Sequence, residues 1–303
     1  MTNPQSKQEH NKNNYKGIIL AGGAGSRLYP ISKVYSKQLT LIYDKPLIYY
    51  PLSILMLGGI REILILSDEN TMPLYKQLFG DGSQLGLKLD YAVQLAPNGI
   101  AEAFIIGEKF SEDNPVCLIL GDNIFYGNID FFYKALANKT GATIFGYQVN
   151  DPERYGIVEF SEDGNAISIE EKPAVPKSQF AVPGLYLFDN SVVEISKNLE
   201  PSVRGELEIT DVNKKYMEMG KLRVEKIGRG VAWLDTGTPE ALLAASNFFG
   251  VIEDRQGLKV ACIEEVAYYK GFINIKQFSV LINSIPKCLY RDYLEKILKE
   301  ESV

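Results

Sequence analysis

Four short apolar runs alternate with stretches of helical character between residues 16 and 120. They cover residues 16–20, 62–66, 87–93 and 115–120. Strands that are apolar throughout are buried on both faces, and strands separated by helices usually pair in parallel. The sequence therefore predicts an α/β fold, with a mainly parallel central sheet flanked by helices.

The helices expected between these strands include residues 51–57, which end at Gly58 and Gly59, and residues 100–110. The first lies in the most apolar stretch of the chain, residues 46–60, which carries two prolines. This stretch is shorter than the roughly 20 residues that a membrane-spanning helix needs. We expect a buried core helix here and no membrane partner.

The pattern becomes richer in β-strand after Gly141. Residues 161–165 are expected to form a turn between two strands, and residues 206–219 an amphipathic helix. The apolar positions of that helix are Leu207, Val212, Tyr216 and Met219. Residues from Pro239 onward are mostly helical in pattern. The strand-like runs of this half cover residues 141–149, 155–160, 166–171 and 181–188.

These changes in pattern divide the chain into three parts. Residues 1–15, rich in Asn, Gln and Lys, are expected to be a disordered extension. Residues 16–240 form one large domain, with a first half over 16–140 and a β-richer half over 141–240. Residues 241–303 are expected to be a helical C-terminal segment, a small appended unit.

Net charge and histidine content exclude several classes of function. The chain has 32 Lys and Arg residues against 38 Asp and Glu, a formal net charge of −6. A protein that coats nucleic acid is usually basic, so no nucleic-acid partner is expected. The one histidine, His10, lies in the polar N-terminal stretch. This excludes a Ser-His-Asp or Cys-His mechanism and a zinc site built from histidines.

Cysteine usage indicates the compartment. Cys117, Cys262 and Cys288 are scattered, and their spacing fits neither metal ligands nor a disulfide framework. This pattern is typical of a reducing compartment. Residues 1–15 also lack the apolar core of a signal peptide. We expect a cytoplasmic protein.

A glycine-rich loop, LAGGAGSRL at residues 20–28, directly follows the first strand. Glycines there let backbone N–H groups converge on an anion, and Arg27 adds a forked cation suited to phosphate oxygens. Lys33 and Lys37 follow at once. The loop is expected to hold a triphosphate, and the alternative is a tight turn with solvated charges. Its glycine spacing fits neither the dinucleotide nor the Walker motif, which disfavours a dinucleotide-dependent oxidoreductase.

Further motifs follow this loop in a fixed order. They are SKQL, YDKPLIYYPLSILMLGGI, GDGSQLGL, YAVQ, GDNIFYG, NDPERYGIVEF, EEKP, GLYLFD, RGELEITDVN and WLDTGT. Together they resemble the sugar-phosphate nucleotidyltransferase family over about residues 16 to 290. The resemblance implies a Rossmann-like mixed sheet of the nucleotide-diphospho-sugar transferase type, with a small β-rich sugar-binding part and C-terminal helices. The large domain would be catalytic, its first half binding nucleotide and its second half sugar.

The implied reaction is attack by a phosphate oxygen of glucose 1-phosphate on the α-phosphorus of dTTP. It gives dTDP-glucose and pyrophosphate, the first step of dTDP-deoxysugar (rhamnose-type) synthesis, and the family suggests a homotetramer. Because the attacking phosphate is already an anion at neutral pH, no protein base is required. The site must align two polyanions and neutralise their charge. A chain with one histidine can therefore still be a catalyst.

The resemblance also implies roles for individual residues. Asp122 and Asp235 would hold Mg²⁺, which prefers a few carboxylate oxygens. Asp122 follows a strand, where open α/β sheets bind ligands, although both aspartates could be turn formers. The expected catalytic residues are Arg27, Lys37 and Lys172. The nucleotide would contact Leu20, Gly22, Gly23, Gly25, Ser26, Gln38, Gln94, Gly99 and Asp122. The sugar phosphate would contact Asn123, Tyr155, Gly156, Glu171, Lys172, Tyr186 and Trp233.

Two departures from the family pattern bear on specificity and regulation. Pro183 stands where threonine is common and removes a backbone donor beside the expected sugar site, so the hexose stays open. Asn128 stands where histidine is frequent, near a second nucleotide site of the family, through which a nucleotide sugar would exert feedback.

Two alternative functions also stay open. One is the same reaction with UTP, since the side-chain amide of Gln94 does not separate thymine from uracil. The other is a non-catalytic, nucleotide-sugar-binding regulator. Such a protein would be expected to have lost some of the charged residues assigned to catalysis and metal binding.

Overall fold

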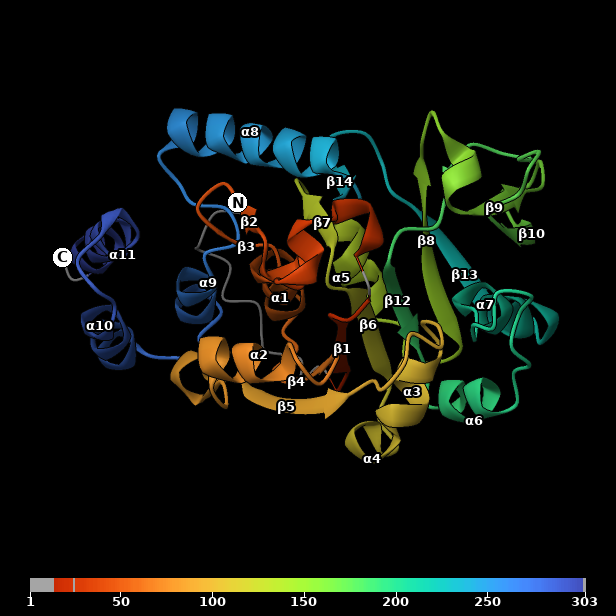
Figure 1. Ribbon diagram of the computed structural model, residues 1–303, viewed down its shortest axis with the longest axis horizontal. Coiled ribbons are helices and arrows are strands. Elements are labelled where there is room, and N and C mark those ends of the chain that lie inside the picture. Colours follow the sequence, from red (N-terminus) through yellow and green to blue (C-terminus); the bar gives the residue numbers. More distant parts are fainter. Residues whose placement is uncertain (1–13, 24, 302–303) are drawn as a thin grey trace.

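The computed structural model describes residues 14–23 and 25–301, which form a mixed central sheet with helices on both faces (Figure 1). The sheet runs from β10 (Ala166–Glu171) through β9 (Gly156–Phe160), β11 (Phe180–Ala181), β8 (Ala142–Gln148), β12 (Leu185–Phe188), β6 (Val116–Leu120), β1 (Lys16–Leu20) and β4 (Glu62–Ser67) to β5 (Lys88–Val93). A further strand, β13 (Leu222–Lys226), pairs with β8. The four strands β6, β1, β4 and β5 are parallel, as predicted, and β12 is antiparallel to β6 and β8.

Two small sheets and several groups of helices complete the described part of the chain. The small sheets pair β7 (Asn123–Tyr126) with β14 (Ala232–Asp235), and β2 (Leu41–Ile42) with β3 (Lys45–Pro46). The helices are α1 (Tyr49–Leu57), α2 (Met72–Phe79), α3 (Glu102–Ile106), α4 (Glu108–Ser111), α5 (Asp130–Leu136), α6 (Ser191–Lys197), α7 (Ile209–Glu218), α8 (Pro239–Gln256), α9 (Ile263–Tyr269), α10 (Ile275–Ser284) and α11 (Leu289–Glu300). No helix in this part of the chain is long and apolar enough to cross a membrane.

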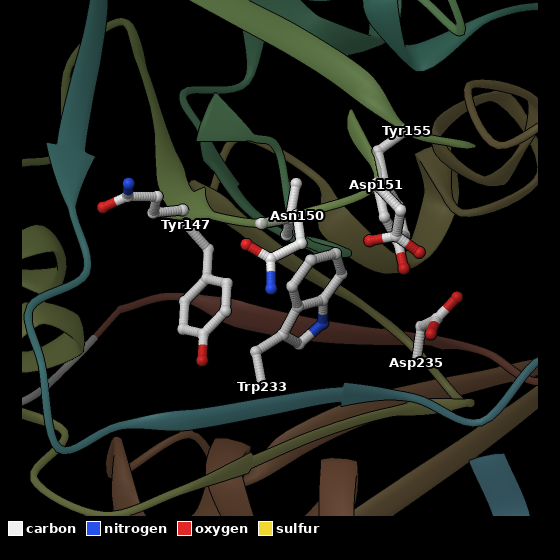
Figure 2. A pocket seen from close by; sticks show the side chains of 8 residues that line it. Tyr147, Asn150, Asp151, Tyr155, Trp233 and Asp235 are labelled. Atoms are coloured by element: carbon white, nitrogen blue, oxygen red, sulfur yellow. The ribbon is translucent and has the colours of Figure 1, made fainter. Parts of the chain in front are cut away.

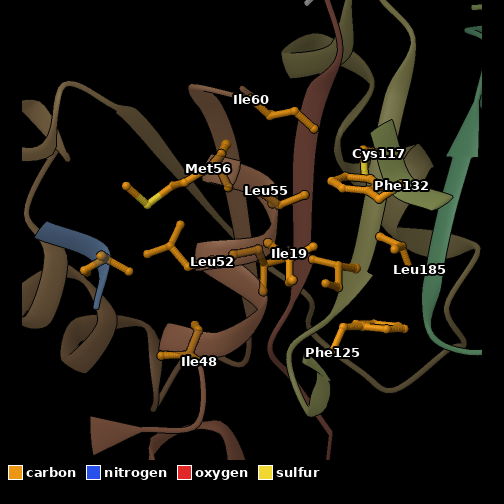
Figure 3. Packing of buried hydrophobic residues seen from close by; sticks show 14 of the residues in the cluster. Ile19, Ile48, Leu52, Leu55, Met56, Ile60, Cys117, Phe125, Phe132 and Leu185 are labelled. Carbon is orange, nitrogen blue, oxygen red and sulfur yellow. The ribbon is translucent and has the colours of Figure 1, made fainter. Parts of the chain in front are cut away.

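The central strands are apolar along their whole length because each face of the sheet has its own core. Ile19 of β1 points into a core shared with α1 and α5, whereas its neighbour Ile18 points into a second core with α3, α6 and α7. Figure 3 shows Ile19 in this core together with Leu55 of α1 and Phe132 of α5. Removing such a side chain from water stabilises the fold by about 1.5–3 kcal/mol.

Three predicted elements differ from the structure. The helix over residues 100–110 is divided at Gly107, which lies so close to β1 that a Cβ there would be 3.0 Å from Ile18 Cδ1. The strand over residues 181–188 is interrupted at Pro183, which has no N–H for a ladder. The amphipathic helix begins only at Ile209, because Glu208 is extended, and it ends at Glu218, just before the exposed Met219.

The two ends of the chain also bear on the predicted divisions. Residues 1–13 of the expected disordered extension lie outside the described residues. Tyr15, which we placed in that extension, is instead buried in the first core, and its hydroxyl donates to the Asn138 carbonyl. At the other end, Ile263 of α9 and Leu294 of α11 belong to the same core. The C-terminal helices therefore share the hydrophobic core of the large domain.

Candidate active site

Two pockets lie where the chain leaves β1, β6 and β8. The loops at the carboxyl ends of parallel strands gather at one edge of a sheet, which explains this position. The first, called here the loop pocket, has a volume of about 170 Å³ and is lined by Gly22, Gly23, Gly25, Ser26, Arg27, Leu28, Lys37, Gln38, Asp122 and Gly237. The second, the aromatic pocket, has about 320 Å³ and is lined by Tyr147, Gln148, Val149, Asn150, Asp151, Tyr155, Trp233 and Asp235 (Figure 2).

The glycine-rich loop after Leu20, the last residue of β1, presents Arg27 with no acidic partner among the described residues. Gly23 and Gly25 have φ angles of 119° and 54°, a region that glycine adopts far more readily than other residues. The loop then enters a 3₁₀ turn, η1 (Ser26–Leu28). The Arg27 guanidinium packs over Gly237, where a Cβ would lie 2.9 Å from Arg27 Nη2. An exposed guanidinium without an ion pair suits an anionic ligand.

Lys37 and Asp122 form a close ion pair inside the loop pocket. Lys37 begins the 3₁₀ turn η3 (Lys37–Leu39) and is only 8% exposed. Its Nζ donates to Asp122 Oδ2 at 2.6 Å. The next residue, Gln38, donates through Nε2 to the Gly22 carbonyl at 3.4 Å and so connects η3 to the glycine-rich loop. A buried ammonium needs such a partner, and an anionic ligand in the pocket would provide a second one.

Asp235 lies beside Asp122 although the two are far apart in sequence. Asp235 ends β14 opposite Asn123 of β7, and the Thr236 hydroxyl donates to the Asp122 carbonyl at 2.9 Å. Burial raises the pKa of Asp235, and the charge of Asp122 raises it further, while Arg154, Tyr155 and Lys37 act in the opposite direction. The two carboxylates therefore share an environment that favours added positive charge.

This arrangement fits a divalent cation that takes few ligands from the protein. The described residues contain no group of three or more His, Cys, Asp or Glu side chains placed to hold a metal ion. Asp122 and Asp235 alone would be its protein ligands, with water and ligand phosphate in the remaining positions. Mg²⁺ is commonly bound in this way, through one or two carboxylates together with substrate phosphates.

Asn123, the first residue of β7, connects the loop pocket to the aromatic pocket through its side-chain hydrogen bonds. Its Oδ1 accepts from Trp233 Nε1 at 2.7 Å and from the Gly184 N–H at 3.0 Å, and its Nδ2 donates to Asp122 Oδ1 at 2.8 Å. Both acceptor positions of Oδ1 are therefore used within the protein, and one amide N–H is left for a ligand. Asn123 thus orients Asp122 and holds Trp233, which packs on Tyr155 in the aromatic pocket.

A third group of predicted residues lies around Glu171. Glu171 Oε2 accepts from the Thr210 hydroxyl at 2.6 Å, and Oε1 lies 3.4 Å from Lys172 Nζ. A Cβ on Gly156 would lie 3.2 Å from Glu171 Oε2, so glycine leaves that carboxylate accessible. The backbone N–H of Lys172 donates to the Tyr155 carbonyl at 3.0 Å. The structure thus brings together four of the residues predicted to bind sugar phosphate.

Gln94 and Gly99 lie beside the glycine-rich loop. Gln94 Nε2 donates to the Gly99 carbonyl at 3.3 Å and to Glu102 Oε2 at 2.7 Å. Its Oε1 faces Gly22, at 3.6 Å from where a Cβ would be. Gly99 has φ 109°, and a Cβ there would lie 2.3 Å from the Leu207 carbonyl oxygen. The Gln94 amide oxygen therefore faces the glycine-rich loop. The backbone at residue 99 leaves no space for a side chain, so only glycine fits there.

Tyr186, another of the predicted sugar contacts, lines neither pocket and lies in the protein interior. It is 4% exposed in the second core and stacks with Phe188. Burial raises the pKa of its hydroxyl, and the charges of Glu171 and Asp122 raise it further. The Tyr186 hydroxyl is therefore buried in the second core, within range of the charges of Glu171 and Asp122.

Sequence reasoning missed three residues that touch the predicted site. Thr210 donates to Glu171, Gly237 lies beneath Arg27, and Arg154 pairs with Asp235 at 3.2 Å. All three stand in motifs that we quoted, but a motif does not say which side chains meet across the fold. For Gly237, the turn pattern of WLDTGT was a usable signal.

Comparison with known proteins gives a consistent set of relatives. The family model described as nucleotidyl transferase matches residues 16–251. A protein of Neisseria meningitidis named glucose-1-phosphate thymidylyltransferase is 52% identical, covering 94% of this chain and 100% of the relative. Proteins of the same name from Xanthomonas campestris and Mycobacterium tuberculosis are 51% and 49% identical, covering 95% and 94% of this chain and 98% and 99% of the relatives.

Two solved structures are similar as well. One from Bacillus anthracis, named as a glucose-1-phosphate thymidylyltransferase in complex with sucrose, has a TM-score of 0.72 at 40% identity and covers 77% of this chain and 94% of that one. A UDP-glucose pyrophosphorylase in complex with UDP-glucose has a TM-score of 0.69 at 22% identity and covers 78% and 99% of the two chains. The second likeness supports the fold alone.

Proposed function

Because the chain belongs to the nucleotidyl transferase family, we propose that it transfers the thymidylyl group of dTTP to α-D-glucose 1-phosphate, forming dTDP-glucose and pyrophosphate. The chain is a nucleotidyltransferase. The named relatives at about half identity cover almost its whole length. The observation that carries the proposal is structural: Arg27, Lys37 and Asp122 line one pocket, and Asp235 lies directly beside it.

The reaction needs charge neutralisation and alignment more than proton transfer. A sugar phosphate is an anion at neutral pH and can attack the α-phosphorus of the nucleotide without a base. In this proposal the triphosphate is bound by N–H groups of the glycine-rich loop and by the Arg27 guanidinium, which has no ion pair within the described part of the chain. Lys37 lies deeper in the loop pocket, where its charge faces the reacting phosphate. Preorganised charges of this kind in a site shielded from water are commonly the largest contribution to catalysis.

We propose Mg²⁺ as the cofactor, held by Asp122 and Asp235. Bound there, it supplies positive charge beside the reacting phosphate and orients its oxygens. The chain prepares the position in two ways. Asn123 Nδ2 donates to Asp122 Oδ1 and so orients that carboxylate, and the pairing of β7 with β14 places Asp235 next to it.

The sugar phosphate is proposed to lie between the glycine of β9 and the two charged residues at the end of β10. Glu171 accepts hydrogen bonds from sugar hydroxyls, and Lys172, whose side chain is half exposed, binds the phosphate. Gly156 lets the sugar approach the backbone. Tyr155 and Trp233 form the wall on the side of Asp235. Gln94 contributes its amide oxygen to the base, which suits the N3–H of thymine and of uracil equally.

One experiment separates this function from its two alternatives. Pyrophosphate release is measured with dTTP and with UTP, each against glucose 1-phosphate and galactose 1-phosphate. The proposal predicts the highest kcat/KM for dTTP with glucose 1-phosphate. A preference for UTP would support a uridylyltransferase. No release with any pair, from a folded protein that binds dTDP-glucose, would support a regulator without catalysis.

Assembly, location and regulation are further proposals. We propose a homotetramer, by likeness to the family, and a cytoplasmic location, since Cys117, Cys262 and Cys288 are all free thiols. Feedback by a nucleotide sugar is proposed near Asn128. There the Asn128 amide makes two hydrogen bonds to Asp130, both at 2.9 Å, at the start of α5.

A further inference from the structure

One arginine bridges the two acidic residues at the edge of the aromatic pocket. Arg154 ends the 3₁₀ turn η5 (Pro152–Arg154). Its Nη1 lies 2.6 Å from Asp151 Oδ2 and its Nη2 lies 3.2 Å from Asp235 Oδ2. Figure 2 shows both of these aspartates at the same end of the pocket. The guanidinium also lies 5.3 Å from the centre of the Tyr155 ring.

The bridge neutralises a carboxylate that the proposed function requires for metal binding. Within the described residues, Asp235 forms one ion pair, and its partner is Arg154. Asp122 is paired in the same way with Lys37. Each of the two carboxylates is thus occupied by a side-chain cation of the protein itself. The two cations differ in burial, since the Arg154 side chain is 38% exposed and that of Lys37 is 9% exposed.

We propose that Arg154 is the counter-ion of Asp235 in the metal-free enzyme, and that a divalent metal ion binds only by displacing it. The Arg154 guanidinium contacts Asp235 Oδ2, and a metal ion would need the negative charge of the same carboxylate. Arg154 has room to leave, because it is partly exposed and keeps a second anchor in Asp151. Lys37 does not have this freedom and stays within the loop pocket. This inference rests on the proposed role of Asp122 and Asp235 as metal ligands.

The test measures binding of Mn²⁺ alone to the purified full chain, by the electron paramagnetic resonance signal of the free ion, without nucleotide or sugar. Removing a competing, partly exposed ion pair should tighten metal binding about two- to fivefold. Arg154→Gln is therefore expected to bind Mn²⁺ about two- to fivefold more tightly than the unmodified chain. Arg154→Lys, which keeps the charge, should lie closer to the unmodified chain.

Two further variants make the outcome decisive. Arg255→Gln removes the same charge near the far end of α8, about 24 Å along that helix from its start near Asp235, and should leave Mn²⁺ affinity unchanged. Asp235→Asn should abolish tight binding. If Arg154→Gln binds Mn²⁺ no more tightly than the unmodified chain, while Asp235→Asn fails to bind it, the proposed role of Arg154 is wrong and the metal-ligand assignment stands. Unchanged binding by Asp235→Asn, or no binding by any protein, would overturn the metal-ligand assignment together with this inference.

Discussion

The substitution Gly237→Ala tests whether the position of Arg27 matters for the reaction. A Cβ at residue 237 would lie 2.9 Å from Nη2 and 3.1 Å from Cζ of Arg27, and the three nearest atoms all belong to that side chain. Real Cβ contacts of this kind are not that short, so the guanidinium must move. None of these three nearest atoms is backbone, and the φ angle of Gly237 is outside the left-handed region. The change should therefore displace a charged group without straining the fold.

The expected magnitude follows from what such a contact contributes. Losing one preorganised charge-stabilising group costs about 2.7–4 kcal/mol, or 10²–10³ in rate. Because Gly237→Ala moves Arg27 without deleting it, we expect a decrease in kcat/KM of about 10- to 100-fold. The free energy of unfolding should be unchanged or up to about 1 kcal/mol higher, since alanine restricts the unfolded chain.

Pyrophosphate release and urea unfolding measure the two quantities on the same protein. Gly228→Ala is the matched control, because a Cβ there meets nothing within 4 Å. It should keep the normal rate. The double variant Arg27→Ala, Gly237→Ala should be no slower than Arg27→Ala, since both changes act on one group. Normal turnover by Gly237→Ala, or rate losses that add in the double variant, would refute this reasoning.

Three other predictions concern the metal, the small sheet and pH. Asp122→Asn and Asp235→Asn should each raise the Mg²⁺ concentration needed for half-maximal rate and slow turnover; a rate and metal dependence equal to the unmodified enzyme would contradict the site. Asn123→Ala leaves the buried Trp233 N–H without its acceptor and should lower the free energy of unfolding in urea by about 1–3 kcal/mol, whereas no loss would show that water replaces the amide. Burial raises the pKa of Glu265 from 4.5 to about 7, opposed by its hydrogen bond from Tyr293 and reinforced by Glu253. Because the carboxyl group holds its proton more tightly in the folded state, the free energy of unfolding falls as pH rises from about 4.5 to 7. Above pH 7 the full loss is reached, up to about 3 kcal/mol. Glu265→Gln should therefore be more stable than the unmodified chain at pH 8 and nearly equal to it at pH 4.5, and a constant difference across pH would contradict this cause.

The elements that the sequence predicted well are those fixed by local patterns. β1 and the loop after it were predicted because an apolar run followed by closely spaced glycines has few other solutions. The division at Gly107 was missed because the side chain that requires glycine there belongs to a distant segment, whereas the interruption at Pro183 had a local signal in the missing N–H of proline. A Cβ on Gly107 would lie 3.0 Å from Ile18 Cδ1 of β1, and nothing in the sequence of residues 100–110 indicates where β1 lies.

The candidate site was predicted in the same uneven way. The glycine-rich loop suggested phosphate binding from its own composition, but the pairing of Asp122 with Asp235 came only from the family resemblance. The physical cause of that pairing is the small sheet of β7 and β14, which spacing along the chain does not show. Arg154 was missed for a related reason, since many charged residues lie nearby in sequence and only the fold selects the one that meets Asp235.

The most direct measurement of the central claim is the configuration at the α-phosphorus of the product. The proposed site surrounds one reacting centre with charged groups and hydrogen-bond donors, and none of the residues named in it acts as a nucleophile. The sugar phosphate should therefore displace pyrophosphate in a single step. With dTTP carrying a chiral α-thiophosphate and glucose 1-phosphate as acceptor, the account predicts inversion of configuration in the dTDP-glucose analogue, followed by phosphorus NMR. Retention would require two displacements through a covalent enzyme intermediate and would contradict it.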